Sequence, residues 1–131
     1  MILIFGGAYQ GKLAYAFKKY GLDERSVYRC SVDDTEMPRD KEIIYEIDKW
    51  VLALIRAGYN GEKLRGKLTD FEEYVCGSDA VIICNDISCG VVPVDSHFRL
   101  WREAVGRMLA VLSENSERVV RLFCGIPTII K

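Results

Sequence analysis

A glycine-rich segment near the N-terminus constrains the fold of this 131-residue chain more than any other feature. The segment runs from residue 6 to Lys12 and fits the pattern G-x-x-x-x-G-K. Residues 2–5, directly before it, are apolar, as expected of a strand buried on both faces. After it, Gly21 is placed to end a helix whose apolar residues recur at helical spacing: Leu13, Ala16, Phe17 and Tyr20. The pattern therefore predicts a loop between a strand and a helix.

Such a loop has the properties of an anion site. Small residues allow successive backbone N–H groups to turn inward, and the following helix directs its positive end at the same place. Lys12 adds an ammonium group for the β- and γ-phosphates. The alternative is a glycine turn that only joins strand to helix. We predict that the loop binds ATP or GTP, with Lys12 catalytic, through Gly6, Gly7, Ala8, Tyr9, Gln10, Gly11, Lys12 and Leu13.

The position after Lys12 departs from the usual pattern of these loops. It normally carries Ser or Thr, whose hydroxyl binds Mg²⁺, but here it is Leu13. Asp86 follows the apolar run 80–84, which predicts a strand whose carboxyl end lies near the loop. We predict that Asp86 is catalytic and holds Mg²⁺ or its water shell. The alternative is that Asn85 and Asp86 merely form the turn after the strand.

The rest of the chain alternates between strand and helix patterns. We expect strands at 26–32, 80–84 and 119–124, a short helix at 70–76, and a helix beginning at Asp95 or Ser96. Asp40 is expected to cap a long helix up to Gly58, and the polar stretch 59–67 to be mobile. This order predicts an α/β fold: a three-layer, P-loop NTPase-like parallel sheet with helices on both faces, forming a single nucleotide-binding domain over residues 1–131.

Composition excludes several classes of protein. A net charge of −1 gives no electrostatic case for nucleic acid or an anionic membrane as partner. No apolar run approaches the roughly 20 residues that span a bilayer, and residues 1–5 lack a basic leader. The five cysteines form no CxxC pair and there is one histidine, so a structural zinc site is poorly supported. We expect a cytoplasmic protein in a reducing compartment.

The second half of the chain resembles one particular family. Asn85-Asp86-Ile87-Ser88-Cys89-Gly90-Val91-Val92-Pro93 is similar to the Asn-Glu-Val-Gly-x-Gly-Ile-Val-Pro segment of adenosylcobinamide kinase/adenosylcobinamide-phosphate guanylyltransferase. Arg99, Trp101-Arg102-Glu103 and Gly106-Arg107 resemble its Arg-x-Phe-Arg-Asp-x-x-Gly-Arg helix. Gly125-Ile126-Pro127 followed by Ile130-Lys131 resembles its Gly-Leu-Pro-x-x-Leu-Lys ending. With the N-terminal loop, the resemblance covers roughly half of the chain.

The resemblance implies an enzyme of cobalamin biosynthesis. Such an enzyme phosphorylates the side-chain hydroxyl of cobinamide with a nucleoside triphosphate and Mg²⁺, then transfers GMP from GTP through a guanylyl-histidine. It also implies a homo-oligomer, often a trimer. The departures are Leu13, Ser88 in place of glycine, Leu109-Ala110 in place of Asn-Gln, and a shorter middle that contains no histidine. In that middle, Asp48 occupies the face where the nucleophile is sought.

Three hypotheses remain open at the level of sequence. The first is nucleotide-dependent phosphoryl transfer to a cobinamide-type alcohol. The second is a catalytically reduced module that binds nucleotide or corrinoid and lacks guanylyltransferase activity, and the third is a P-loop kinase for another small alcohol. Arg99 and Arg102, three residues apart on the expected helix, are candidates for binding phosphate or corrin carbonyls, or for local pairing with Glu103. Tyr9 must point outward, and His97 is expected at an exposed helix start.

Overall fold

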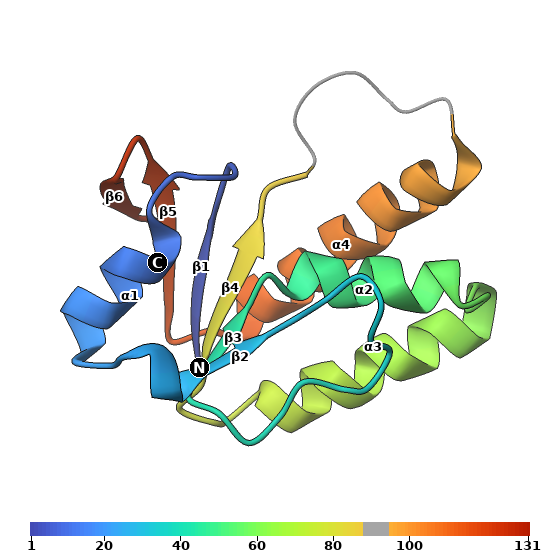
Figure 1. Ribbon diagram of the computed structural model, residues 1–131, viewed down its shortest axis with the longest axis horizontal. Coiled ribbons are helices and arrows are strands. Elements are labelled where there is room, and N and C mark those ends of the chain that lie inside the picture. The colour runs from blue at the N-terminus through green and yellow to red at the C-terminus, as the bar shows by residue number, and fades with distance from the viewer. Residues whose placement is uncertain (88–94) are drawn as a thin grey trace.

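A single twisted sheet forms the centre of the structure, a computed structural model that describes residues 1–87 and 95–131. Within these residues, six strands follow the order β2-β3-β4-β1-β5-β6 (Figure 1). All neighbouring strands are parallel except β5 and β6, which are antiparallel. The strands are β1 (Ile2–Gly6), β2 (Val27–Arg29), β3 (Ile43–Tyr45), β4 (Val81–Asn85), β5 (Arg118–Phe123) and β6 (Ile126–Ile129).

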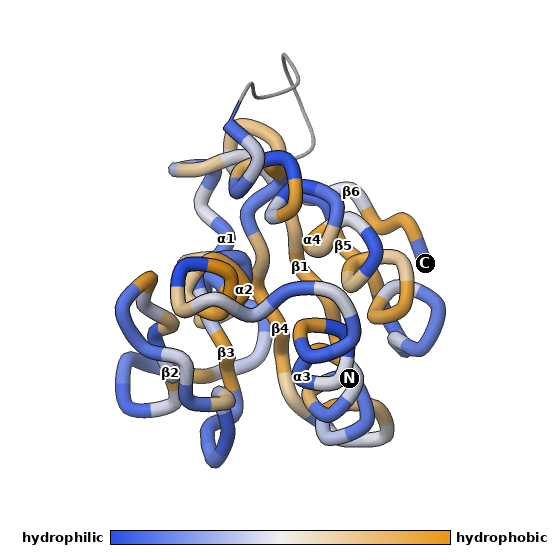
Figure 2. Tube along the Cα trace, turned by 90° about the vertical axis from the view of Figure 1, so that its right-hand side faces the viewer, coloured by the Kyte–Doolittle hydropathy of each residue, from blue (hydrophilic) through white to orange (hydrophobic). Residues whose placement is uncertain are grey.

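Helices cover both faces of this sheet. Alternate residues of the central strands point to opposite faces, so that Leu3 and Ile82 belong to one apolar cluster while Ile4 and Ile83 belong to the other. α1 (Lys12–Tyr20) packs against the second cluster. The first cluster is covered by α2 (Ile47–Arg56), α3 (Gly61–Val75) and α4 (Ser96–Asn115). Hydrophobic segments accordingly run through the middle of the molecule in Figure 2. The predicted three-layer, P-loop NTPase-like α/β fold is confirmed.

The predicted helix from Asp40 is wrong in its first half. Ile43 and Ile44 are both almost fully buried, on opposite faces of the sheet, so this segment is the strand β3 rather than a helix. The helix α2 begins only at Ile47, after Glu46 in the left-handed conformation (φ 60°). Asp40 also has a positive φ of 65°, and its N–H donates to the Tyr74 hydroxyl. Ile43 and Ile47 are four residues apart, a spacing that fits one face of a helix and also one face of a strand, which explains the error.

The prediction of a mobile stretch at 59–67 is also wrong. α3 spans Gly61–Val75 and buries a regular stripe of Leu64, Leu68, Phe71 and Val75. Gly61 and Gly66 lie in the first two turns of α3, and because glycine disfavours helix, the sequence pattern was interpreted as a loop. Near the C-terminus, Cys124 (φ 51°) and Gly125 (φ 75°) form a tight turn that returns the chain as β6, a strand that the sequence pattern did not predict.

Other boundaries agree more closely with expectation. α1 ends at Gly21 in the left-handed conformation, and Asp95 caps α4 by accepting hydrogen bonds from the N–H groups of His97 and Phe98. β2 is shorter than predicted. Ser88, Cys89, Gly90, Val91, Val92 and Pro93 of the family-like segment lie outside the described residues. In the parts of the chain that are described, no helix is both long and apolar enough to cross a membrane.

Candidate active site

The loop between β1 and α1 has the backbone geometry of an anion site. Positive φ values occur at Gly6 (156°), Tyr9 (58°) and Gly11 (83°). Gly6 lies so close to β5 that a Cβ atom would collide with the backbone oxygen of Leu122. Gly11 is the N-cap of α1, and as a glycine it offers no side chain to the first N–H groups of the helix. These groups are the ones that bind phosphate in such loops.

Lys12 directs its ammonium group back into this loop. Its Nζ donates a hydrogen bond to the carbonyl oxygen of Gly7 at 2.6 Å, and only 4% of the residue is exposed. Burial lowers the pKa of Lys12, while the negative charge of Asp48 is the largest influence that raises it. A lysine withdrawn from water in this way is a strong partner for an anion that enters the loop.

Gln10 fastens the loop to the β5–β6 turn. Its backbone oxygen accepts a hydrogen bond from the N–H of Gly125 at 3.1 Å, and its side-chain oxygen Oε1 accepts one from the N–H of Cys124. Tyr9, beside it, is fully exposed, as predicted. The C-terminal hairpin therefore forms one wall of the candidate site.

Asp86 lies where the sequence placed it, after β4 and close to the loop. β4 pairs directly with β1, and the N–H of Asp86 donates to the carbonyl oxygen of Gly6 at 2.8 Å. The residue is half-buried. Within residues 1–87 and 95–131, no group of three histidine, cysteine or acidic residues is arranged to enclose a metal ion. A metal role for Asp86 stays a prediction, in which phosphates and water supply the other ligands.

Two acidic residues act on Lys12 from the segment after β3. Glu46 was missed at the level of sequence, and Asp48 was considered only as a nucleophile, because β3 was read as part of a helix. Glu46 follows β3 and forms an ion pair with Lys49 at 2.5 Å. Asp48, in the first turn of α2, is 2% exposed, and its carboxylate accepts two hydrogen bonds from Asn85. The continuous Ile-Ile-Tyr run followed by Glu-x-Asp was the signal that was available. With both carboxylate oxygens on Asn85, Asp48 is poorly placed to act as a nucleophile.

The remaining predicted residues are spread more widely. Leu13 packs against the apolar cluster under α1, which explains why no hydroxyl occupies this position. Arg99 is exposed and Arg102 half-buried in the first turns of α4, and Figure 1 places the start of α4 on the other side of β4 from the loop. Glu103, the acid considered for local pairing with Arg99, forms an ion pair with Arg107. The binding roles of both arginines stay predictions.

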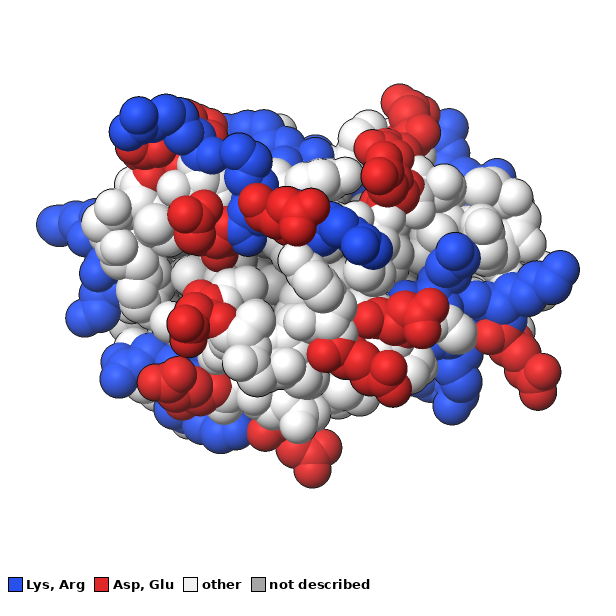
Figure 3. Space-filling model, turned by 90° about the horizontal axis from the view of Figure 1, so that it is seen from below, with Lys and Arg blue, Asp and Glu red and all other residues white. Residues whose placement is uncertain are grey.

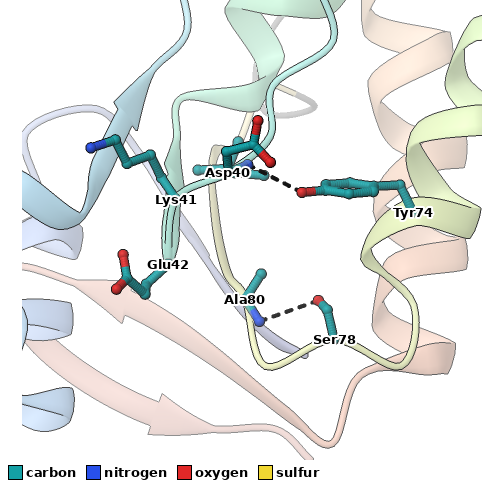
Figure 4. A pocket seen from close by; sticks show the side chains of 7 residues that line it. Asp40, Lys41, Glu42, Tyr74, Ser78 and Ala80 are labelled. Atoms are coloured by element: carbon teal, nitrogen blue, oxygen red, sulfur yellow. Dashed lines mark hydrogen bonds between the residues drawn. The ribbon is translucent and has the colours of Figure 1, made fainter.

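A separate cavity of about 340 Å³ lies at the opposite end of the sheet. Figure 4 shows its lining residues, which lie before or within β3, before β4, or at the end of α3. Asp40 and Tyr74 approach each other there through the hydrogen bond described above. On the face seen from below, acidic and basic side chains are interspersed (Figure 3). That face shows no continuous basic surface of the kind that binds nucleic acid.

The sheet, the loop and the buried lysine at its helix define a P-loop NTPase-like α/β protein. The sequence model of one family, cobinamide kinase / cobinamide phosphate guanyltransferase, matches residues 39–130, which is more than half of the chain. The chain belongs to this family, whose members are transferases that use nucleoside triphosphates in cobalamin biosynthesis. No curated protein sequence matches the chain. The matched region begins after the phosphate loop, so the role of the loop depends on its own geometry.

Proposed function

We propose that the chain binds ATP or GTP in the Gly6–Lys12 loop and transfers the γ-phosphoryl group to the side-chain hydroxyl of a cobinamide. The observation that carries this proposal is the position of Lys12, the first residue of α1. The residue is buried, and its ammonium group lies 2.6 Å from the backbone oxygen of Gly7 in the loop. The family supports the acceptor, because its members act on cobinamide.

In this proposal the hydroxyl oxygen of the acceptor attacks the γ-phosphorus and the bond from that phosphorus to the β-phosphate bridging oxygen breaks. The nucleoside diphosphate leaves, and the hydroxyl proton passes to solvent or to a nearby base. The loop N–H groups and Lys12 stabilise the negative charge on the phosphates. Mg²⁺ entering with the nucleotide would supply further neutralisation and would be held by Asp86. These residues thus bind and orient the polyphosphate chain.

A second candidate function is a reduced module that binds nucleotide or corrinoid without turnover. The specific observation in its favour is Leu13 of α1, which packs against the apolar cluster between this helix and the sheet. A leucine at this position provides no hydroxyl ligand for a metal at the loop. The guanylyl-transfer step is the less supported of the family's two activities. His97, the single histidine of the chain, lies exposed at the start of α4 rather than in the middle segment.

The deciding experiment combines turnover with binding. The purified protein is incubated with ATP or GTP, Mg²⁺ and adenosylcobinamide, and the phosphorylated product is followed; nucleotide affinity is measured by titration calorimetry. Lys12→Ala should abolish turnover and lower affinity by at least about tenfold. Lys19→Ala, an exposed lysine of the same helix, is the matched control and should leave both unchanged.

Each result separates the candidates. Binding without turnover supports the reduced module, and turnover only with another alcohol supports a kinase of different acceptor specificity. Absence of any nucleotide affinity would overturn both kinase candidates and the nucleotide-binding form of the reduced module. We also propose that the chain acts as a single domain, as a homo-oligomer, in the cytoplasm. Exposed apolar residues on and beside the β5–β6 hairpin support the assembly: Phe123, Ile126, Ile129 and Ile130.

A further inference from the structure

Asp48 connects three elements of the fold: α2, β4 and α4. It lies in the first turn of α2. Its Oδ1 accepts the backbone N–H of Asn85 at 3.0 Å, and its Oδ2 accepts the side-chain amide of the same residue at 3.2 Å. Its backbone oxygen accepts the indole N–H of Trp101, on α4, at 2.7 Å. Through Asn85, Asp48 therefore fixes the carboxyl end of β4 relative to α2. Through Trp101, it fixes α4 relative to the same helix.

The same carboxylate also acts on the charge of Lys12. Both residues are almost fully removed from water, and a buried charge is strongly unfavourable unless an opposite charge or hydrogen bonds compensate it. Asp48 contributes the largest of the negative charges that favour the protonated form of Lys12. Burial raises the pKa of Asp48, and the hydrogen bonds from Asn85 lower it. Asp48 thus favours the charged form of Lys12, while the hydrogen bonds from Asn85 stabilise the buried carboxylate of Asp48 itself.

We propose that Asp48 is the positioning residue of the phosphate loop: its carboxylate holds Asn85 at the end of β4, opposite Gly6 of the loop, and provides the counter-charge for the buried ammonium group of Lys12. Asp48 acts through Asn85 and Lys12 and does not itself touch the ligand. The inference deepens the proposed function, because a charged Lys12 matters to the loop only if an anion binds there.

Other titratable groups face this pair and must be accounted for. Glu46, between β3 and α2, acts on both Lys12 and Asp48. Cys84 on β4 and Cys30 after β2 lie within the influence of Asp48, and burial raises the pKa of both thiols well above the ordinary value, which keeps them neutral near pH 7. Glu46 is paired with Lys49 and is less buried than Asp48. It is therefore the matched control.

The first test needs no nucleotide. The folding equilibrium is measured by urea unfolding at pH 8 for the wild type, Asp48→Asn, Lys12→Met and the double variant. Because each single change leaves the other group buried and uncompensated, the double variant should be more stable than the two single effects predict, by about tenfold in the equilibrium constant. Additive effects would overturn the proposal. This test stands even if the chain binds no nucleotide.

The second test follows nucleotide affinity between pH 7 and pH 10. Polyphosphate binding needs the charged form of Lys12, so affinity is present below the pKa of Lys12 and is lost as the pH rises through it. Removing the Asp48 charge lowers that pKa, so in Asp48→Asn the loss should begin at a lower pH, with a smaller displacement in Glu46→Gln. A uniformly weaker affinity with an unmoved pH profile would show a merely structural role and overturn the proposal.

A third measurement covers the case in which Asp48→Asn does not fold. In Lys12→Met the Asp48 carboxylate has lost its counter-charge, and a buried carboxylate destabilises the fold only above its pKa. The stability deficit of Lys12→Met relative to the wild type should therefore be larger at pH 8 than at pH 5. An equal deficit at both pH values would contradict the coupling between the two residues.

Discussion

Gly6 lies at the junction of β1 and the phosphate loop, with its Cα facing the backbone of β5. Two independent constraints act there: a φ of 156°, and an approach to the Leu122 oxygen that leaves no room for a Cβ atom. Gly7 is under neither constraint, because a Cβ atom at that position would only reach the flexible side chain of Gln10 at 3.5 Å. Adjacent glycines of one motif thus have different reasons to be glycine.

We predict that Gly6→Ala destabilises the protein by about 2–3 kcal/mol, because β1 and β5 must separate locally to admit the methyl group. Gly7→Ala should change the free energy of unfolding by less than about 1 kcal/mol. Urea unfolding followed by circular dichroism measures both. Equal losses in the two variants would show that the close approach of Gly6 to β5 is not the constraint.

Residue patterns predicted the loop correctly but not the whole site. The loop glycines and Lys12 form a contiguous motif, and a strand before it and a helix after it fix where it lies. Asp48 and Glu46 belong to no contiguous motif of this kind. Their proximity to Lys12 depends on β3 ending at Tyr45, and the pairing of β3 with β4 is a long-range contact that no local pattern contains.

At the scale of elements, helix α4 shows how a single residue defines a boundary. Asp95 adopts an extended backbone conformation, and its Oδ1 accepts hydrogen bonds at 2.8 Å from His97 N–H and 3.3 Å from Phe98 N–H. A carboxylate there also interacts favourably with the positive end of the helix. The sequence indicated a start at Asp95 or Ser96, because both are capping residues shortly before the apolar stripe that begins at Phe98.

Asp95→Ala should therefore cost about 1 kcal/mol of stability, and Asp95→Ser, which keeps a capping oxygen, should cost markedly less. Chemical denaturation of both variants gives the comparison. The result would be contradicted if serine and alanine were equally destabilising, since the loss would then not come from the cap.

Elements that were predicted differ from those that were missed in one respect. α1 has a clear stripe, a glycine stop and a flanking strand, so every local signal agrees. In β3 and α3 the signals conflict: isoleucines four residues apart imitate a helix before Ile47, and Gly61 and Gly66 suggest a loop where α3 forms. Burial of Ile43 and Ile44 on both sheet faces, and of Phe71 against Trp50, overrides these local preferences.

At the scale of the whole molecule, the edge of the sheet at β6 is the surface most suited to association. All four residues of β6 are exposed, and it forms the outer strand of the sheet. Exposed apolar side chains beside an open strand edge are unusual on a monomer.

We predict that light scattering coupled to gel filtration finds an oligomer, and that Ile126→Lys with Ile129→Lys shifts it to the monomer. Tyr74→Lys, a comparably exposed aromatic position on α3, should leave the assembly intact. A monomeric wild type, or an oligomer that tolerates both lysines, would exclude the β6 edge as the contact.

The two hydrogen bonds from the Cys124–Gly125 turn to Gln10 join positions separated by more than a hundred residues. During synthesis the ribosome releases the first residues long before the last ones, at roughly 5–20 residues per second. A nascent chain therefore lacks the wall that shapes its phosphate pocket until residues 124 and 125 have been synthesised and released. A stop codon before position 124 should yield a polypeptide whose pocket never matures.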